Sequence, residues 1–300
     1  MARDARADLL VASMPAVFVL IWSTGFIVAR YGMPHTGPMT FLAWRYAFSI
    51  VAFLGWIALA RLPRTAWPRG GAQWAHLAVT GVLMHAVYLG GVWAAVKHGM
   101  GAGTVALLIG LQPVLTALWV SGQGREHRIA LHQWAGLALG LAGITLVVWR
   151  KLGHGEVSAL NFGLTLLALL AITIGTLYQK RHVAPCDVRT ANTVQLAAAL
   201  ALTAPLAAWE GAPVELHPEL VGAMAWSVLG LTLGGSSLLY LLIQRGAATR
   251  VTSLMYLVPP CTAVMAWALF DEPLGAPVLL GLLLTATGVW LVNRAPARGM

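Results

Sequence analysis

Charged residues are scarce in this sequence. They make up 10% of its 300 residues, while 59% are hydrophobic, whereas a soluble globular protein carries about a quarter charged residues. The deficit extends along the whole chain, so one membrane anchor on a soluble domain does not explain it. A large soluble helical core is the alternative, but its outer helices would need polar faces, and the sequence offers few. The composition therefore predicts an integral membrane protein.

Several motifs that carry chemistry are also absent. The two cysteines, Cys186 and Cys261, lie far apart with no CxxC or His-rich spacing, so neither a disulfide framework nor a metal site is indicated. No GxxxxGK[ST] sequence suggests a nucleotide-driven pump. Residues 234–237 (GGSS) offer serines, but no GxSxG or HExxH motif accompanies them. We therefore expect no cofactor and no enzyme activity, with an intramembrane enzyme as a minor alternative.

The net charge of +9 raises the question of nucleic acid as a partner. No basic cluster is interleaved with stacking aromatics, and the basic residues lie in short gaps between apolar runs. That placement is typical of membrane topology. We expect a lipid bilayer around the chain and no nucleic-acid partner, and the sequence leaves the oligomeric state open.

Ten apolar runs of about twenty residues, the length that crosses a hydrocarbon core of ~30 Å, follow one another along the chain. They cover residues 13–31, 38–61, 73–97, 100–121, 129–150, 157–180, 188–209, 220–245, 248–270 and 274–293. With the amino terminus inside, fourteen Lys and Arg residues fall in the inner segments, and the four in the outer segments are Arg30, Lys97, Arg150 and Lys151. Basic residues concentrate on the cytoplasmic side. The sequence thus predicts an all-α integral membrane protein with ten transmembrane helices and both termini cytoplasmic.

The two parts of the chain resemble each other. At a constant offset of 147 residues, the matching positions are Trp93, Gly99, Leu107 and Pro113 with Tyr240, Gly246, Leu254 and Pro260. We therefore predict two five-helix repeats, residues 1–151 and residues 152–300, which form one transmembrane domain. Because five is odd, the second repeat enters the membrane from the opposite side. Inverted repeats are a transporter architecture with the substrate site near the bilayer midplane.

These residues also carry a family resemblance. The stretch IWSTGFIVAR (residues 21–30) resembles the first-helix motif of EamA-type members of the drug/metabolite transporter superfamily, although WSTG stands where WGSN is commoner. The signature that closes each half of such proteins resembles two series here, Pro113, Glu126, Gly136 and Gly143, then Pro260, Glu272, Gly281 and Gly288. The resemblance implies a ten-helix exporter of small metabolites in the cell (inner) membrane. One subgroup exports amino acids, notably aromatic ones.

Polar and aromatic side chains at mid-span are the candidates for a substrate cavity, because polar groups at membrane depth usually face the protein interior or water. The expected substrate-binding residues are His85, Tyr88, Trp93, Gln112, Trp22, Ser23, Ser236, Tyr240 and Tyr256. Thr232 and Ser236 belong to a stripe with a spacing of four in the eighth span. Helix–helix hydrogen bonding is the alternative for these two, plain core packing is the alternative for the tyrosines, and Gln112 could satisfy a carbonyl freed by Pro113.

Arg45 lies about two turns inside the outer end of the second span. We expect its long side chain to extend outward to the membrane surface. The alternative is that it attracts a carboxylate at the outer mouth of the protein.

Prolines interrupt two corresponding spans. Pro259 and Pro260 fall inside an apolar run, and Pro113 is the counterpart of Pro260. Gly or Pro interruptions at matching places in two repeats point to a midplane site. We predict that Pro113, Pro259 and Pro260 form a conformational hinge beside the cavity.

The energy source and substrate are predicted only broadly. No Asp or Glu lies deep in a predicted span, and His85 is the one central group with a reference pKa near neutral. Transport is therefore either uncoupled or coupled through His85. A cavity of Tyr, Trp, His and Gln suits neutral, zwitterionic or cationic small molecules with an apolar part. We expect a secondary transporter working by alternating access, with a channel-like facilitator as the alternative.

Overall fold

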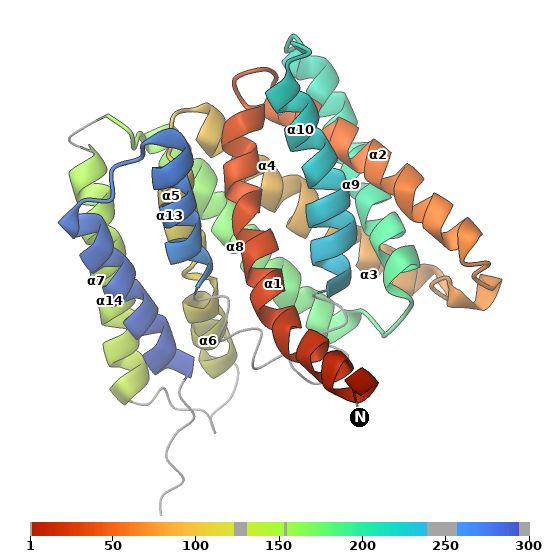
Figure 1. Ribbon diagram of the computed structural model, residues 1–300, viewed down its shortest axis with the longest axis horizontal. Coiled ribbons are helices and arrows are strands. Elements are labelled where there is room, and N and C mark those ends of the chain that lie inside the picture. Colours follow the sequence, from red (N-terminus) through yellow and green to blue (C-terminus); the bar gives the residue numbers. More distant parts are fainter. Residues whose placement is uncertain (1, 123–130, 153–154, 239–256, 294–300) are drawn as a thin grey trace, which may run out of the picture.

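The computed structural model describes the backbone at residues 2–122, 131–152, 155–238 and 257–293. Every regular element in these ranges is a helix and none is a β-strand, as the sequence predicts. In chain order the elements are α1 (Ala2–Gly32), α2 (Pro38–Leu59), η1 (Arg64–Ala66), α3 (Gly71–Gly81), η2 (Val82–Val87), α4 (Tyr88–Lys97), α5 (Ala102–Ile109), α6 (Gln112–Gly122), α7 (Leu131–Leu152), α8 (Ala159–His182), α9 (Val188–Glu210), α10 (Pro218–Trp226), η3 (Ser227–Gly235), α13 (Val258–Phe270) and α14 (Ala276–Asn293). Figure 1 shows them as a bundle with the amino terminus at its lower end.

Six helical segments in the described part of the chain are long and apolar enough to cross a membrane. They are Pro38–Leu59, Gly71–Lys97, Leu131–Trp149, Ala159–His182, Val188–Glu210 and Pro218–Leu238. The shorter apolar helices are Ala16–Gly32, Ala102–Thr116, Val258–Phe270 and Ala276–Leu291. The all-helical membrane architecture is thus confirmed. The count of ten spans, the repeat and the side of the termini stay predictions.

The outer surface of the bundle is apolar, which suits lipid rather than water. On α2, the large side chains Trp44 and Phe48 are exposed, while Leu42, Tyr46 and Phe53 are buried in the bundle. A helix between lipid and a protein core needs apolar side chains on both faces. Any polar side chain on the inner face must therefore find its partner inside the bundle.

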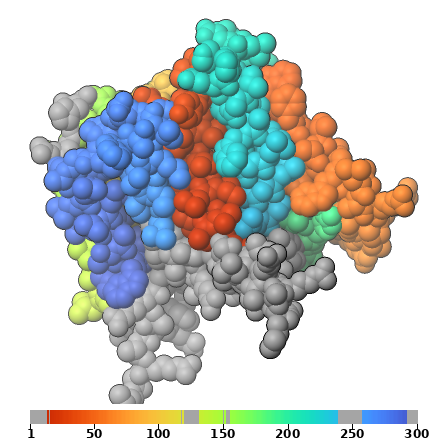
Figure 2. All heavy atoms as spheres, in the orientation of Figure 1, coloured from red at the N-terminus to blue at the C-terminus, as the bar shows by residue number. Residues whose placement is uncertain are grey.

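Helices far apart in the sequence pack against each other. α7 runs along α14, α2 runs along α9, and α4 packs against α8 (Figure 1). α1 lies between α13 and the α10–η3 segment, as the space-filling view shows (Figure 2). Each of these contacts joins a helix from residues 1–151 to a helix from residues 152–300, so the core forms between the two parts of the chain.

The contact between α7 and α14 depends on glycine. A Cβ atom on Gly143 would lie 2.6 Å from the carbonyl oxygen of Gly281, and one on Gly281 would lie 2.8 Å from the carbonyl oxygen of Gly143. Further along, Gly288 approaches the backbone of Gly136 in the same way. Small residues let membrane helices come this close, and van der Waals packing then holds them together.

Two long helices contain π-helical turns that the sequence did not lead us to expect. η2 interrupts the helix that runs from Gly71 to Lys97, and η3 follows α10. Within η3, the Thr232 hydroxyl donates to the carbonyl oxygen of Ser227, five residues back, at 2.8 Å. The sequence predicts a polar stripe through Thr232 at a spacing of four residues, but this segment is π-helical, with a repeat of five residues at Thr232. π-Helical turns are rare and often mark functional sites.

The fourth span is two helices rather than the one expected. α5 ends at Ile109, a turn follows, and α6 begins at Gln112, so Pro113 lies in the first turn of α6. Pro259 and Pro260 likewise lie in the first turn of α13. A proline there costs no intrahelical hydrogen bond, since the first N–H groups have no partner in the helix. Residues 248–256 lie outside the described residues, so the kink expected in the ninth span stays a prediction.

Candidate functional site

Arg45 is buried inside the bundle. It lies on the inner face of α2 and is only 7% exposed. Its Nε and Nη2 atoms both donate to Thr232 Oγ1 of η3, each at 3.2 Å. The expectation that Arg45 extends outward to the membrane surface is therefore wrong, because its guanidinium finds an acceptor across the bundle instead.

His85 lies next to this pair, within η2. The Tyr46 hydroxyl donates to the main-chain carbonyl oxygen of His85 at 2.7 Å, and the two rings meet edge to face with centroids 6.1 Å apart. From α9, the Gln195 side chain contacts the imidazole and also donates to Thr80 Oγ1 at 3.3 Å. His85 therefore has a tyrosine of α2 and a glutamine of α9 as neighbours inside the bundle.

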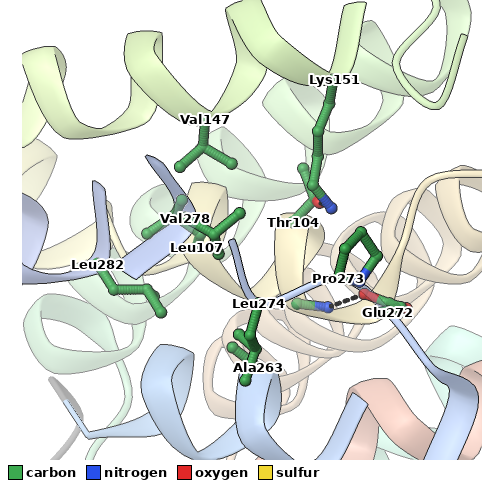
Figure 3. A pocket seen from close by; sticks show the side chains of 11 residues that line it. Thr104, Leu107, Val147, Lys151, Ala263, Glu272, Pro273, Leu274, Val278 and Leu282 are labelled. Carbon is green, nitrogen blue, oxygen red and sulfur yellow. Dashed lines mark hydrogen bonds between the residues drawn. The ribbon is translucent and has the colours of Figure 1, made fainter. Parts of the chain in front are cut away.

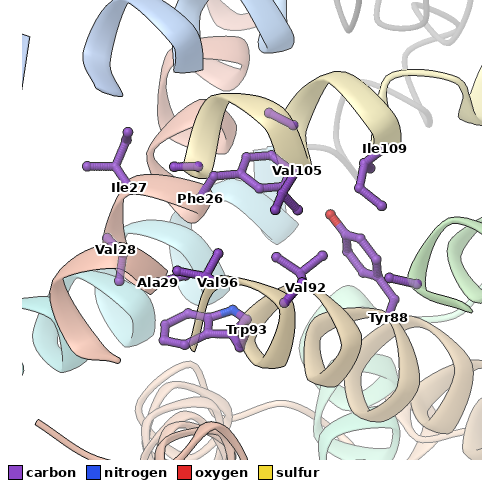
Figure 4. Packing of buried hydrophobic residues seen from close by; sticks show 14 of the residues in the cluster. Phe26, Ile27, Val28, Ala29, Tyr88, Val92, Trp93, Val96, Val105 and Ile109 are labelled. Carbon is purple, nitrogen blue, oxygen red and sulfur yellow. The ribbon is translucent and has the colours of Figure 1, made fainter. Parts of the chain in front are cut away.

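Tyr88 and Trp93 both lie on α4 but have different surroundings. Tyr88 is buried and points from α4 toward Ile109 of α5 (Figure 4). Tyr88 follows His85 by three residues along the same continuous helix. Trp93 is buried in the apolar core, where its ring stacks on that of Phe41 with centroids 4.3 Å apart. Tyr88 thus lies close to His85, and Trp93 belongs to the apolar core.

Trp22 and Ser23 lie in the second half of α1. Trp22 is partly buried, with its ring centroid 5.3 Å from that of Phe18. The buried Ser23 hydroxyl donates to the carbonyl oxygen of Val19 at 2.7 Å, and the Thr262 hydroxyl of α13 donates to the carbonyl oxygen of Ser23 at 3.2 Å. The Ser23 side chain is therefore engaged with its own helix.

The other expected binding residues lie further along the chain. The Gln112 amide, at the start of α6, donates to Thr176 Oγ1 of α8 at 3.3 Å. Ser236 directly follows η3 and is partly buried. Tyr240 and Tyr256 lie outside the described residues. The structure thus brings His85 and Tyr88 together with Arg45, Tyr46 and Thr232. We call these five residues the Arg45 cluster. A substrate-binding role for the nine expected residues stays a prediction.

A second set of polar contacts lies at the end of the bundle where α2 and α5 begin. The Glu210 carboxylate accepts from the backbone N–H of Thr40 and from its hydroxyl, each at 2.9 Å. The Glu272 carboxylate accepts from the backbone N–H of Ala102 at 2.9 Å. The amino-terminal N–H groups of a helix have no partner within it and favour negative charge. Two carboxylates late in the chain therefore cap two helices of its first part.

A small pocket lies beside Glu272 (Figure 3). At its polar side, buried Lys151 donates to Glu156 Oε1 at 2.7 Å and to Thr104 Oγ1 at 2.6 Å. Glu156 also accepts from the backbone N–H of Gly101 at 3.0 Å. The remaining lining is mostly apolar, so the pocket combines a compensated ion pair with an apolar wall.

Three side chains with metal-binding chemistry meet at the same end. His35, His217 and Glu219 offer ligand atoms that all lie within 4.8 Å of one another. The His35 and His217 rings stack with centroids 4.4 Å apart, and His35 Nε2 lies 3.0 Å from Glu219 Oε2. The spacing of these residues in the sequence gave no sign of this grouping.

The inward position of Arg45 was missed at the sequence level, although a signal existed. Trp44 and Phe48 mark the outer face of α2, and Leu42 and Ser49 fall on the opposite face. Arg45 lies three residues after Leu42 and four before Ser49, so helical periodicity puts it on the same face as these two. Helical periodicity groups these three residues from the sequence alone, and the structure shows that their common face is the buried one.

Two segments of the chain, residues 9–149 and residues 161–294, match the EamA-like transporter family. The chain belongs to this family. An uncharacterized transporter of Archaeoglobus fulgidus is 24% identical to this EamA protein over 93% of the chain and 95% of its own length. A probable amino-acid metabolite efflux pump of Escherichia coli is 24% identical, with 91% of each chain covered. The uncharacterized inner membrane transporter YedA of Escherichia coli is 25% identical over 93% of this chain and 89% of its own.

A solved crystal structure shares the fold of this EamA protein. Its TM-score is 0.66 at 17% sequence identity, and the match covers 93% of this chain and 94% of the other. Together with the family match, the apolar helices identify a multi-pass membrane transporter rather than an enzyme. The resemblance stated from the sequence is thereby confirmed.

Proposed function

We propose that this protein is a secondary transporter that exports small organic metabolites, either amino acids, especially aromatic ones, or organic cations. The observation that carries the proposal is the Arg45 cluster, in which polar groups from α2, η2, α4 and η3 meet inside an apolar bundle. Polar side chains at membrane depth are costly and typically serve substrate pathways. The relatives named as amino-acid metabolite efflux pumps support amino acids as substrates. The relative named as an inner membrane transporter supports the cell (inner) membrane as the location.

The proposal includes two inverted repeats of five spans, residues 1–151 and 152–300. The family matches the chain twice, once in each part. The glycine contacts support a two-fold relation, because Gly136 and Gly143 of α7 correspond to Gly281 and Gly288 of α14 and meet them in reverse order. Reciprocal contacts of this kind arise at a two-fold axis. An offset of 147 also carries η2 to residues 229–234, within η3.

The proposed orientation has both termini in the cytoplasm. The basic residues support it through their concentration in the segments on the side of the amino terminus. In this orientation the carboxylate caps of α2 and α5 lie at the outer end.

We place the hinge of alternating access at the helix starts that carry Pro113, Pro259 and Pro260. A Cβ atom on Gly110, in the turn between α5 and α6, would lie 2.8 Å from Pro259 Cγ. The break in the fourth span therefore touches the proline pair directly. Broken helices at corresponding places in two repeats are where transporters bind substrate and bend.

Coupling is proposed to be either absent or dependent on His85. Reconstituted protein with an imposed pH gradient separates these possibilities. If the flux responds to the pH gradient and His85→Gln abolishes that response, transport is coupled through His85. If neither the pH gradient nor His85→Gln changes the flux, transport is uncoupled.

Uptake into proteoliposomes tests the function. A panel of amino acids and organic cations would be compared for wild type and for His85→Ala, Tyr88→Ala and Tyr240→Ala, with Tyr31→Ala as a matched control. Tyr31 packs against Phe270 at the far end of α1. We expect saturable flux that falls in the first three variants and persists in the control. Normal flux in all three would put the substrate site elsewhere, and non-saturable flux would indicate a channel.

A further inference from the structure

The guanidinium of Arg45 has more donors than its partner can use. It carries five N–H groups, of which two donate to Thr232 Oγ1. The other three have no acceptor among the residues that the structure describes. The Thr232 hydroxyl is neutral and gives its own proton to the Ser227 carbonyl. The positive charge of Arg45 is therefore not balanced by its hydrogen-bond partner.

No described carboxylate balances this charge either. Each one lies at a helix end or in a connection, and none pairs with Arg45. The described carboxylates are Glu156, Asp187, Glu210, Glu215, Glu219, Asp271 and Glu272.

In the segments outside this description, the sequence holds one acidic side chain, Glu126. Residues 239–256 contain no Asp or Glu. Asp4 and Asp8 lie at the start of α1, at the lower end of the bundle, whereas α2 begins at the upper end (Figure 1). Glu126 precedes Leu131, the first residue of α7, by five residues in the sequence.

A buried cation without an anion is costly, and a buried arginine in a protein is nearly always paired. Within membrane helices such a residue marks a functional site. The chemistry that would complete it is an anion with two acceptor oxygens, since a guanidinium presents parallel donors in a planar fork. A carboxylate meets that requirement.

The neighbours of Arg45 suit the rest of an amino acid. Tyr46 follows Arg45 on α2, its ring meets that of His85 edge to face with centroids 6.1 Å apart, and Tyr88 follows His85 by three residues along the same helix. These aromatic groups offer ring faces and edges to an apolar side chain. His85 and Tyr88 are also residues that the sequence predicts to bind substrate.

We propose that Arg45 binds the carboxylate of the transported substrate. The proposal rests on the export function above and narrows its substrate class to amino acids and other small molecules with a free carboxylate. Organic cations are excluded, because the same charge repels them. In the described state Thr232 occupies part of the guanidinium fork, and the substrate carboxylate replaces it or adds to it.

Matched substrates test this assignment on the full-length protein in proteoliposomes. The probes are phenylalanine, leucine and threonine, each compared with its own amide, together with 2-phenylethylamine and choline as cations. The variants are Arg45→Gln and Arg45→Lys. Arg30→Gln is the matched control, since Arg30 is exposed at the end of α1, over the ring of Phe270.

We expect wild type to carry at least one of the acids with a kcat/KM about tenfold or more above that of its amide, the effect of losing a charge-assisted hydrogen bond. Arg45→Gln should lower transport of the acid by a similar factor and bring the ratio of acid to amide close to one. Arg45→Lys should keep part of the ratio, because it keeps the charge without the fork. Arg30→Gln should match wild type.

Other outcomes overturn the proposal in distinguishable ways. If wild type carries the amides or the cations at the same rate as the acids, Arg45 is not the carboxylate anchor, although the export function stands. The same conclusion follows if Arg45→Gln leaves the ratio of acid to amide transport unchanged. No saturable flux of any probe would reject the export function itself. If Arg45→Gln does not fold, the ratios of acid to amide transport in wild type and in Arg45→Lys test the proposal.

Discussion

At the scale of single residues, several interior polar groups of this protein find partners on other helices, while a few buried hydroxyls, such as that of Ser49, have none among the described residues. The Tyr46 hydroxyl of α2 is an example of a matched group, because it donates to the main-chain carbonyl oxygen of His85 in η2. A hydrogen bond of this kind contributes about 1 kcal/mol to stability.

Replacing Tyr46 with Phe tests that contribution. We expect Tyr46→Phe to lower the free energy of unfolding by about 1 kcal/mol, because the His85 carbonyl oxygen loses its side-chain donor inside the bundle. Thermal unfolding in detergent measures the loss. Tyr31→Phe, which changes a ring that packs on Phe270, serves as the control. Equal melting temperatures in both variants would mean that water or another group replaces the hydroxyl.

At the scale of elements, close packing of two helices rests on the absence of a few Cβ atoms. Gly143→Ala places a methyl group 2.6 Å from the Gly281 carbonyl oxygen, where backbone has to move. Gly163→Ala on α8 meets nothing within 4 Å. Both changes bring the same gain in helix propensity, about 1 kcal/mol, so their difference isolates the packing.

We therefore expect Gly143→Ala to lower the melting temperature in detergent and Gly163→Ala to raise it slightly or leave it unchanged. Cross-linking between cysteines introduced on α7 and α14 would show whether the two helices separate. A Gly143→Ala variant as stable as Gly163→Ala would contradict a close glycine contact.

The start of α9 gives an element-scale prediction that depends on pH. Asp187 caps this helix by accepting from the backbone N–H of Arg189 at 2.9 Å, and the Arg189 side chain lowers the pKa of the Asp187 carboxyl. A folded pKa below the unfolded value of about 3.9 means that the stabilisation is present above that pH and is lost as the pH falls through the folded pKa.

Asp187→Ala should cost about 1 kcal/mol at neutral pH, the usual loss of a helix cap. Asp187→Asn should cost less, because the amide oxygen still accepts from the backbone. Unfolding measured at pH 7 and near pH 3 checks both, and the difference between Asp187→Ala and wild type should narrow at the lower pH. A difference that grows at low pH would contradict the sign of this argument.

At the scale of the whole molecule, the two parts of the chain are tied together at one end by carboxylates. Glu210 and Glu272 cap α2 and α5 respectively, and each belongs to the second part of the chain while its helix belongs to the first. Opening this end of the bundle requires both caps to break. We therefore expect them to hold that end closed.

Thiol labelling tests this closure. Leu107 is buried beside Glu272 in the pocket of Figure 3, so Leu107→Cys, in a background with Cys186→Ser and Cys261→Ser, reports access from that end. We expect an impermeant maleimide to label it several-fold faster when Glu272→Ala is added. Glu215→Ala, which removes a charge from the same end without uncapping a helix, is the control. Equal labelling rates in the Glu272→Ala and Glu215→Ala variants would contradict the hypothesis that the caps hold this end closed.

Composition and hydrophobic patterning determined the class of this protein. A chain with so few charges cannot cover its helices with polar faces, and apolar runs of membrane length in series leave a helical membrane fold as the outcome. The paired motifs, from Pro113 and Pro260 to Gly143 and Gly288, were sufficient to indicate the family. These features are local, so the sequence displays them directly.

Only the tertiary structure decided which polar groups meet. The partner of Arg45 is Thr232, 187 residues away, and the hydrogen-bond acceptor of Tyr46 is a carbonyl in a π-helical turn that no residue type signals. Depth along a span can be read from a sequence, but the neighbour across the bundle depends on how helices pair and rotate. The prediction that the Arg45 side chain extends to the membrane surface was wrong for that reason. A long cationic side chain reaches water from an outer face of a helix and a buried acceptor from an inner face, and helix packing decides which face is which.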